Sequence, residues 1–124
     1  MSVFAAPPIS PMRISFDPAT AAIEPAGPVL TRRMSDLEGL FTDSAGWKRA
    51  ADGDDPVVYT VHSSPVPEIG RELPQSITTI QPGDCGGEFY MTKGHQHPDP
   101  QGEIYLGLTG VGGPLLFPTS RTWS

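Results

Sequence analysis

The chain has 124 residues, the size of one domain, and its 14 glycines and 15 prolines would interrupt long helices and so exclude a bundle of them. Acidic residues outnumber basic ones by 14 to 8, and the net charge of −6 excludes a nucleic-acid partner, which needs clustered cations. The single cysteine forms no internal disulfide, no apolar run approaches the length of a membrane span, and the first residues lack the pattern of a signal peptide, so we expect a cytoplasmic protein with no membrane partner.

The N-terminal half is predicted to hold a short arm, two strands and two helical turns. Residues 1–11 are small residues and prolines, typical of a disordered or loosely docked arm, and residues 12–124 are predicted to form a single domain. Alternating polarity predicts the strands, and side chains that can cap a helix N-terminus predict the turns. The strands are expected at 12–16 and 31–34, and the helical turns at 36–41 and 45–51.

Strand signals dominate the second half, where β-branched and aromatic residues alternate with turns rich in proline and glycine, including Gly86–Gly87. Short strands at this spacing predict an all-β sandwich or barrel. The last strand begins within ten residues of the C-terminus, and no later strand covers the open edge, so we expect the barrel to be incomplete at that end. The strands are expected at 57–61, 76–80, 87–93, 103–108 and 115–117.

The residues with the clearest chemistry lie between 86 and 113. His95 and His97 are two residues apart, so an extended backbone would point both imidazoles to one face. Glu103 opens the next predicted strand, and Tyr105 shares its face, whereas the intervening aliphatic side chains would pack on the other side. If the two strands pair, two imidazoles and a carboxylate meet, a ligand set suited to Fe(II), Mn, Ni or Zn.

Each of these residues also has an ordinary interpretation. Histidines in a polar, proline-rich loop are often surface residues, and a glutamate at a strand start is often solvated. Thr78 and Thr92, on neighbouring predicted strands, are common β residues, although hydroxyls that point inward could bind a phosphate or a sugar. Tyr59 would by default be a core aromatic with its hydroxyl at the rim.

The segments GEFYMTKGHQH (87–97) and GEIYLGLTGVGG (102–113) resemble the first cupin motif of the archaeal-type glucose-6-phosphate isomerases. RRMSDLEGLF at 32–41 and DDPVVYTV at 54–61 agree with this resemblance, which extends from about residue 12 to residue 113. It implies a cupin-like β-barrel, usually a homodimer, that binds one divalent metal ion and interconverts glucose 6-phosphate and fructose 6-phosphate. No histidine follows His97 to match the family's fourth ligand, so we expect a C-terminally shortened member.

The resemblance also assigns roles to particular residues. His95, His97 and Glu103 match the metal ligands, and Glu103 is the acid expected to act in catalysis. The residues that match the sugar-phosphate pocket, in which the threonine hydroxyls and the Gly94 N–H would hold the phosphate, are Tyr59, Thr78, Thr92, Gly94 and Tyr105.

A divalent cation can polarise the carbonyl of the open-chain sugar, and a nearby carboxylate can move the proton between C1 and C2. A proton shuttle and a hydride shift both agree with the sequence. Three hypotheses stay open: an active isomerase, an inactive shortened member of the family, and a non-catalytic cupin that binds sugar or metal.

Overall fold

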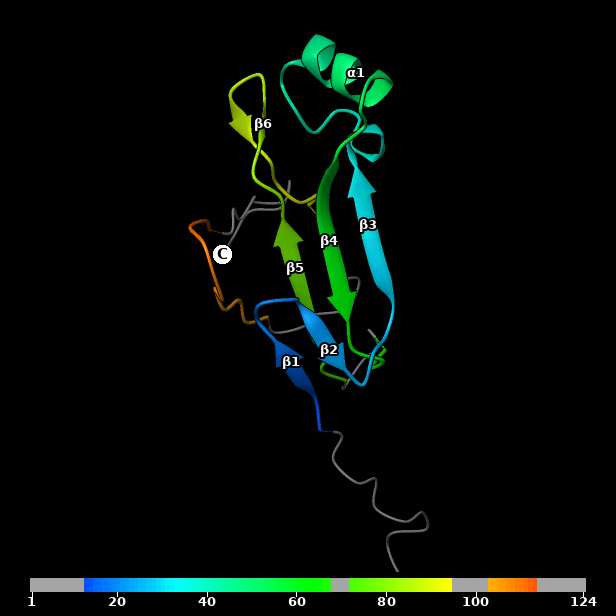
Figure 1. Cartoon of the computed structure of the whole chain (residues 1–124), viewed down its shortest axis with the longest axis vertical. Coiled ribbons are helices and arrows are strands. Elements are labelled where there is room, and N and C mark those ends of the chain that lie inside the picture. The colour runs from blue at the N-terminus through cyan, green and yellow to red at the C-terminus, as the bar shows by residue number, and fades with distance from the viewer. Residues whose placement is uncertain (1–12, 68–71, 95–102, 114–124) are drawn as a thin grey trace, which may run out of the picture.

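The computed structural model describes residues 13–67, 72–94 and 103–113 (Figure 1). The described part is rich in short strands and contains one α-helix and one 3-10 turn, as the all-β prediction with one or two short helices required. In chain order the elements are β1 (Ser15–Asp17), β2 (Ala22–Glu24), β3 (Val29–Arg33), η1 (Met34–Asp36), α1 (Ser44–Asp52), β4 (Val57–Ser63), β5 (Ser76–Ile80), β6 (Asp84–Cys85) and β7 (Glu88–Phe89).

An antiparallel sheet of three strands, in the order β3-β4-β5, forms the centre of the molecule. Val61 of β4 faces Thr78 of β5 and Leu30 of β3, and Tyr59 faces Ile80 and Arg32. β-branched and aromatic residues fill these strands and suit a pleated, half-buried surface. The strands predicted at 57–61 and 76–80 are therefore confirmed, the second with its bounds unchanged.

Smaller elements lie at the two ends of this sheet. The β1–β2 hairpin lies at one end, whereas α1 and β6 lie at the other (Figure 1). β2 contacts both β4 and β5, and its Ile23 is buried. The first strand was predicted a little too early, at 12–16, and β2 and β6 were not predicted.

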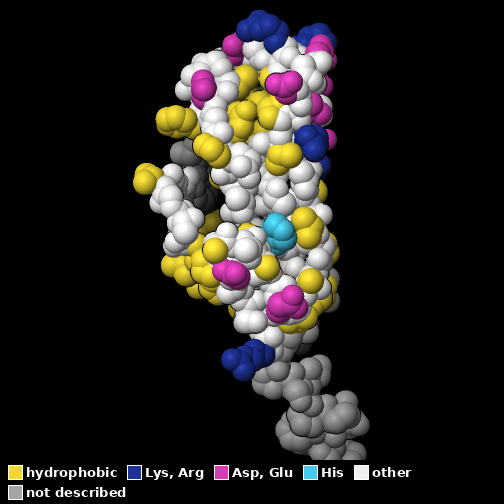
Figure 2. Space-filling model, viewed as in Figure 1, with side chains coloured by type: hydrophobic (Ala, Val, Ile, Leu, Met, Phe, Trp, Pro, Cys, Tyr) yellow, Lys and Arg dark blue, Asp and Glu magenta, His cyan; other side chains and the backbone are white. Residues whose placement is uncertain are grey.

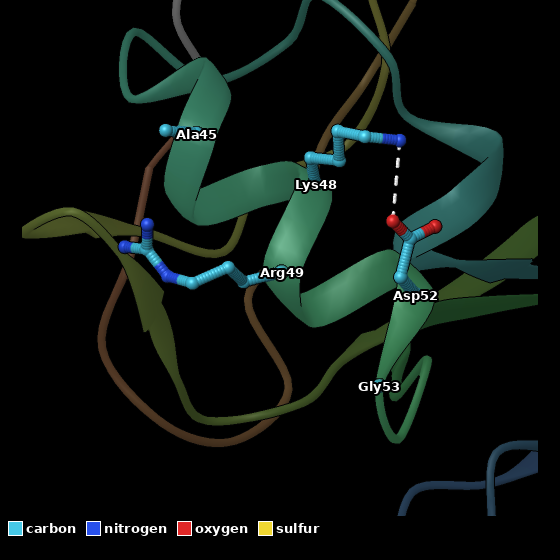
Figure 3. Close-up of a pocket in the computed structure, with 5 residues that line it drawn as sticks. All are labelled: Ala45, Lys48, Arg49, Asp52 and Gly53. Carbon is cyan, nitrogen blue, oxygen red and sulfur yellow. Dashed lines mark ion pairs between the residues drawn. The ribbon is translucent and has the colours of Figure 1, made fainter.

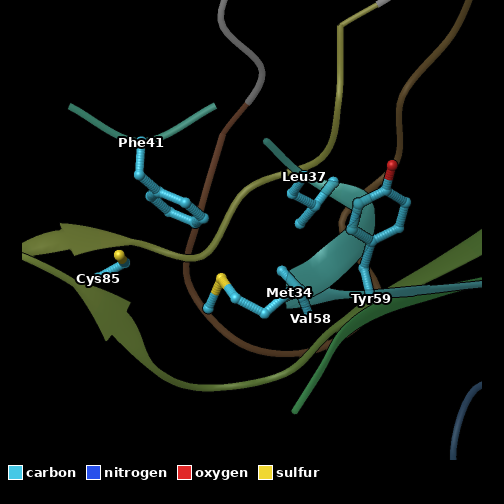
Figure 4. Packing of buried hydrophobic residues seen from close by; sticks show 6 residues of the cluster. All are labelled: Met34, Leu37, Phe41, Val58, Tyr59 and Cys85. Atoms are coloured by element: carbon cyan, nitrogen blue, oxygen red, sulfur yellow. The ribbon is translucent and has the colours of Figure 1, made fainter. Parts of the chain in front are cut away.

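The main hydrophobic cluster lies where η1 and the α1 end of the sheet meet (Figure 4). Each of its side chains is at most 5% exposed, and Val58 is fully buried. Trp47 of α1 packs against the cluster and donates its indole N–H to the Met34 carbonyl oxygen at 2.7 Å, which ties the helix to η1. The members of the cluster are Met34, Leu37, Phe41, Val58, Tyr59 and Cys85.

The two helical predictions had different outcomes. The helix at 45–51 is confirmed as α1, whose N-cap Asp43 accepts a hydrogen bond from the Gly46 N–H at 2.8 Å. The turn at 36–41 was wrong, because the helical turn lies earlier, at η1. The backbone N–H of Arg33 donates to the Asp36 carboxylate at 2.9 Å and caps the start of that turn. Gly39, with φ of +83°, then carries the chain out of a helical path.

The turn glycines predicted at 86 and 87 are confirmed. They form the two-residue turn between β6 and β7, with φ of +60° and +88°, a conformation that glycine adopts without strain. The hairpin is fixed to the loop before α1, because the Thr42 N–H donates to the Glu88 carboxylate at 2.6 Å.

Two later strand predictions were wrong: one strand is shorter than predicted, and the other does not form. The strand predicted at 87–93 is reduced to Glu88–Phe89, and residues 103–108 form no strand. Ile104 and Leu106, expected to pack against a sheet, are 97% and 76% exposed. An alternating sequence becomes a strand only where another strand completes its hydrogen bonds, and no described strand pairs with this segment.

No closed barrel forms among the described residues, whose strands make three separate small sheets. The arm predicted for residues 1–11 and the strand predicted at 115–117 lie outside the described residues. Within the described ranges, no helix combines the length and apolar character needed to cross a membrane.

Replacing a buried member of the cluster should destabilise the protein far more than replacing an exposed residue. Leu37, 1% exposed, should lose about 2–5 kcal/mol of unfolding free energy on substitution by alanine, because the change removes buried contacts and leaves a cavity. Leu73, 71% exposed, is the matched control, and its alanine variant should unfold like wild type in urea. Equal losses in the two variants would contradict the position of the core.

Asp55 joins the start of β4 to η1 and supplies a pH-dependent contribution to stability. Its carboxylate accepts hydrogen bonds from the Ser35 N–H at 2.7 Å and the Ser35 hydroxyl at 2.8 Å. These two bonds favour the ionised form and hold the pKa of Asp55 below its ordinary value of 3.8, with a smaller effect from the charge of Arg33.

Because the folded-state pKa is depressed, this stabilisation is present above about pH 4 and is lost as the pH falls through the folded-state pKa. The Ser35→Ala variant should therefore be less stable than wild type at neutral pH, and the difference should shrink on acidification below about pH 4. Thermal unfolding from pH 7 to pH 2 measures it, with Ser15→Ala on the exposed strand β1 as the control. A difference that grew at low pH would contradict this account.

Candidate functional site

Tyr59 connects the hydrophobic core to the segment that precedes the histidine pair. Its ring belongs to the buried cluster and is 4% exposed. Its hydroxyl oxygen accepts a hydrogen bond from the backbone N–H of Lys93 at 3.2 Å. The expectation of a core aromatic with its hydroxyl at the rim matches this placement. The contact with Lys93, 34 positions along the chain, has no signal in the sequence.

Thr92 and Gly94 flank the anchored residue Lys93, so the same hydrogen bond brings both of them beside Tyr59. A further contact supports the segment: the ring of Tyr90 lies 6.3 Å from that of Phe41. Thr92 and Gly94 are exposed, and a Cβ atom placed on Gly94 would meet no atom within 4 Å. The space around Gly94 is therefore open in the described structure.

Thr78 lies on the same face of the sheet as Tyr59. Thr78 is directly opposite Val61, two residues from Tyr59 on β4, so Thr78 and Tyr59 are diagonal neighbours. The Thr78 side chain is exposed, as a ligand-binding hydroxyl needs to be. Four of the predicted pocket residues are thus gathered around β4: Tyr59, Thr78, Thr92 and Gly94.

Glu103 and Tyr105 form a second group, on the segment 103–113. The Tyr105 phenol donates a hydrogen bond to the Glu103 carboxylate, although the strand face that the two side chains were predicted to share does not form. Partial burial is the largest cause that raises the pKa of Tyr105, and the negative charge of Glu103 and this hydrogen bond raise it further. Tyr105 is 65% exposed, so it does not line an enclosed pocket within the described residues.

The predicted metal ligands His95 and His97 lie outside the described residues, directly after Gly94. Among the residues that the structure does describe, no group of three histidine, cysteine, aspartate or glutamate side chains comes together as a metal site would. The donor set itself, two imidazoles and a carboxylate, fits the borderline divalent cations chemically.

A depression in the surface lies on α1, away from these residues, and is lined by Ala45, Lys48, Arg49, Asp52 and Gly53 (Figure 3). Lys48 forms an ion pair with Asp52 at 3.2 Å, and the side chain of Arg49 extends away from that pair. Both partners of the ion pair are well exposed, so the pair adds little to stability. None of the predicted site residues lines this depression.

Several large hydrophobic side chains of the described residues are exposed at the surface. Hydrophobic side chains reach the surface beside α1 and β6 and again near the β1–β2 hairpin (Figure 2). Phe16, Phe89 and Ile104 are 51%, 83% and 97% exposed. The structure thus defines a class of protein. It is rich in strands, groups hydroxyl-bearing residues around its central sheet and exposes apolar side chains near its ends.

The model of the family "Glucose-6-phosphate isomerase (GPI)" matches residues 31–120. The chain therefore belongs to the glucose-6-phosphate isomerase family. The match covers all five predicted pocket residues, and it continues past residue 113, where the resemblance seen in the sequence ended.

Individual relatives agree with this family. The chain is 40% identical over 107 residues to the glucose-6-phosphate isomerases of Thermococcus litoralis and Pyrococcus furiosus, which covers 86% of this chain and 56% of each relative. It is 35% identical over 103 residues to a putative glucose-6-phosphate isomerase 2 of Rhizobium meliloti. The chain thus spans just over half the length of the curated relatives it matches.

Removing the Tyr59 hydroxyl should release the segment 92–94 without disturbing the core. Tyr59→Phe keeps the buried ring and deletes only the acceptor for the Lys93 N–H, so the unfolding free energy should fall by about 0.5–1.5 kcal/mol. The amide of Lys93 should exchange with solvent faster, as measured by NMR. Tyr90→Phe, which keeps the ring that packs against Phe41, is the control and should leave this amide protected.

Proposed function

We propose that this chain is a metal-dependent aldose–ketose isomerase that interconverts glucose 6-phosphate and fructose 6-phosphate. The observation that carries the proposal is the hydrogen bond from the Lys93 N–H to the Tyr59 hydroxyl. It sets Thr92 and Gly94 beside the sheet face that bears Thr78, in a chain of the glucose-6-phosphate isomerase family.

The phosphate-binding role follows from the donors that this arrangement leaves available. The hydroxyls of Thr78 and Thr92 and the N–H of Gly94 can each donate to a phosphate oxygen. The Tyr59 hydroxyl accepts from Lys93, so its own proton is free to be donated to the substrate. Neutral donors held by a rigid sheet can bind an anion without many cations, as the net charge of −6 requires.

In the proposed metal site, His95, His97 and Glu103 would hold one divalent ion, Fe, Mn, Ni or Zn, and the bound ion would polarise the sugar carbonyl. Glu103 would take the proton from one of C1 and C2 and return it to the other. The Tyr105 phenol donates to the Glu103 carboxylate and would orient it for this transfer. The ordinary pKa of a tyrosine is 10.0 and that of Tyr105 is raised above it, so the phenol is protonated at neutral pH.

The proposed enzyme is a cupin-like barrel that acts in the cytoplasm as a homodimer. The antiparallel strands β3, β4 and β5 would form part of its wall. The open apolar edges of the described part agree with further covering by other chain segments or by a second copy.

A second candidate function is binding of metal or sugar phosphate without turnover. It is favoured by the segment 103–108, which carries Glu103 yet forms no strand and exposes its aliphatic side chains. A catalytic carboxylate has to be held firmly, since small displacements cost large factors in rate.

The purified chain should convert fructose 6-phosphate to glucose 6-phosphate when Mn(II) or Fe(II) is supplied. His97→Ala should abolish turnover and reduce the bound metal, and Glu103→Gln should lower kcat by about 100-fold or more. His62→Ala is the matched control, because His62 lies on β4 three residues from Tyr59 and therefore on the opposite face of the sheet.

A coupled assay measures the turnover, and metal analysis of the dialysed protein measures the binding. A folded protein that showed no conversion with any of the four metals would contradict the isomerase proposal. If metal still raised its melting temperature, the binding function would be supported instead.

A further inference from the structure

Arg32 is a cation on the same sheet face as the proposed phosphate-binding residues. It lies on β3 directly opposite Tyr59, and residues directly opposite each other in an antiparallel pair point to one face. Continuing across the sheet, this face also presents Thr78 on β5. β4 is the middle strand, so Arg32 on β3 and Thr78 on β5 lie on the two strands that flank it.

The guanidinium of Arg32 has no partner among the described residues. Its Nε atom is buried and makes no hydrogen bond there, and no described carboxylate forms an ion pair with the side chain. The neighbouring Arg33 differs, because it donates to the Asp55 carbonyl oxygen at 3.0 Å. Acidic residues are common in the chain, 14 in all, yet none of those that the structure describes forms an ion pair with Arg32.

A buried donor without an acceptor is destabilising, and the cost is greater when the group is charged. Arginine stays protonated in proteins, so Arg32 cannot relieve this cost by losing its proton. Native structures satisfy nearly all buried donors, and the exceptions point to a missing water, ion or ligand. The guanidinium is also shaped to bind two oxygens of a phosphate at once.

We propose that Arg32 is a phosphate-binding residue that completes, from β3, the site formed by Thr78, Thr92 and Gly94. The ligand class is a phosphomonoester dianion, whose oxygens would lie over β4 between Arg32 and Thr78. This inference rests on the proposed function for the identity of the sugar but not for the anion itself. Arg32 is here a substrate-positioning group that acts on the phosphate and not at C1 or C2.

The proposal predicts that one substitution weakens binding without weakening the fold. Arg32→Met keeps most of the apolar stem and removes the unpartnered charge, so the melting temperature should stay the same or rise. The affinity for inorganic phosphate and for fructose 6-phosphate should fall about tenfold or more, because a charge-assisted, two-point contact is lost. Fructose, which has no phosphate, should bind alike to both proteins.

Isothermal titration of the metal-free full chain in EDTA measures these affinities without requiring turnover. Arg49→Met is the matched control, because it removes the same charge from α1, outside the proposed site, and should bind phosphate like wild type. Arg32→Lys keeps a positive charge but loses the two-point contact, so its affinity should lie between those of wild type and Arg32→Met.

Any one of four results would overturn the proposal for Arg32. The first is wild-type affinity for phosphate in Arg32→Met, and the second is an equal loss in Arg49→Met. The third is a melting temperature for Arg32→Met several degrees below wild type together with unchanged binding by Arg32→Lys, which would mark a structural role. A wild-type chain that bound neither phosphate nor fructose 6-phosphate would also overturn it.

These results are separable from those of the isomerase assay. Loss of phosphate binding in Arg32→Met, in a protein that shows no turnover with any metal, would support the anion site and contradict the isomerase. Turnover by wild type together with unchanged phosphate binding in Arg32→Met would do the reverse.

Discussion

The candidate site depends on one buried side chain, Tyr59. Its ring is part of the hydrophobic cluster, and its hydroxyl holds the backbone at Lys93. The same residue thus contributes apolar burial to the fold and a polar anchor to the segment that carries Thr92 and Gly94. A tyrosine suits this double role because its ring is apolar and its hydroxyl can both donate and accept a hydrogen bond. Without this anchor the described contacts of residues 92–94 with the sheet would be fewer.

The charged side chains of the described structure differ in whether they have a protein partner. The Asp55 carboxylate accepts two hydrogen bonds from Ser35 of η1, and Lys48 is paired with Asp52 on the surface of α1. Arg32, by contrast, stays without a partner among the described residues although it lies next to the core. A buried donor without an acceptor, such as the Nε atom of the half-buried Arg32, points to a missing ligand, which is why this residue and not the better paired ones carries the inference about phosphate.

Local sequence patterns predicted the elements whose capping and turn residues lie within a few positions of the element. Asp43 caps α1 by accepting a bond from a backbone N–H three residues on, and two adjacent glycines supply the positive φ angles of the β6–β7 turn. β5 was predicted with its full bounds because β-branched residues end there at a proline and a glycine. The segment 103–108 has an equally clear alternation, yet it forms no strand, since pairing depends on a partner that alternation does not provide.

The sequence by itself determined the family, the residue types of the candidate metal set and the short elements whose caps and turns lie within a few residues of one another. The tertiary structure alone decided that Tyr59 reaches Lys93, that Thr78 is its diagonal neighbour and that Arg32 faces the same side without a partner. The physical reason is that these contacts join strands far apart in the chain. Their register is set by side-chain packing across the whole sheet and not by any short stretch of residues.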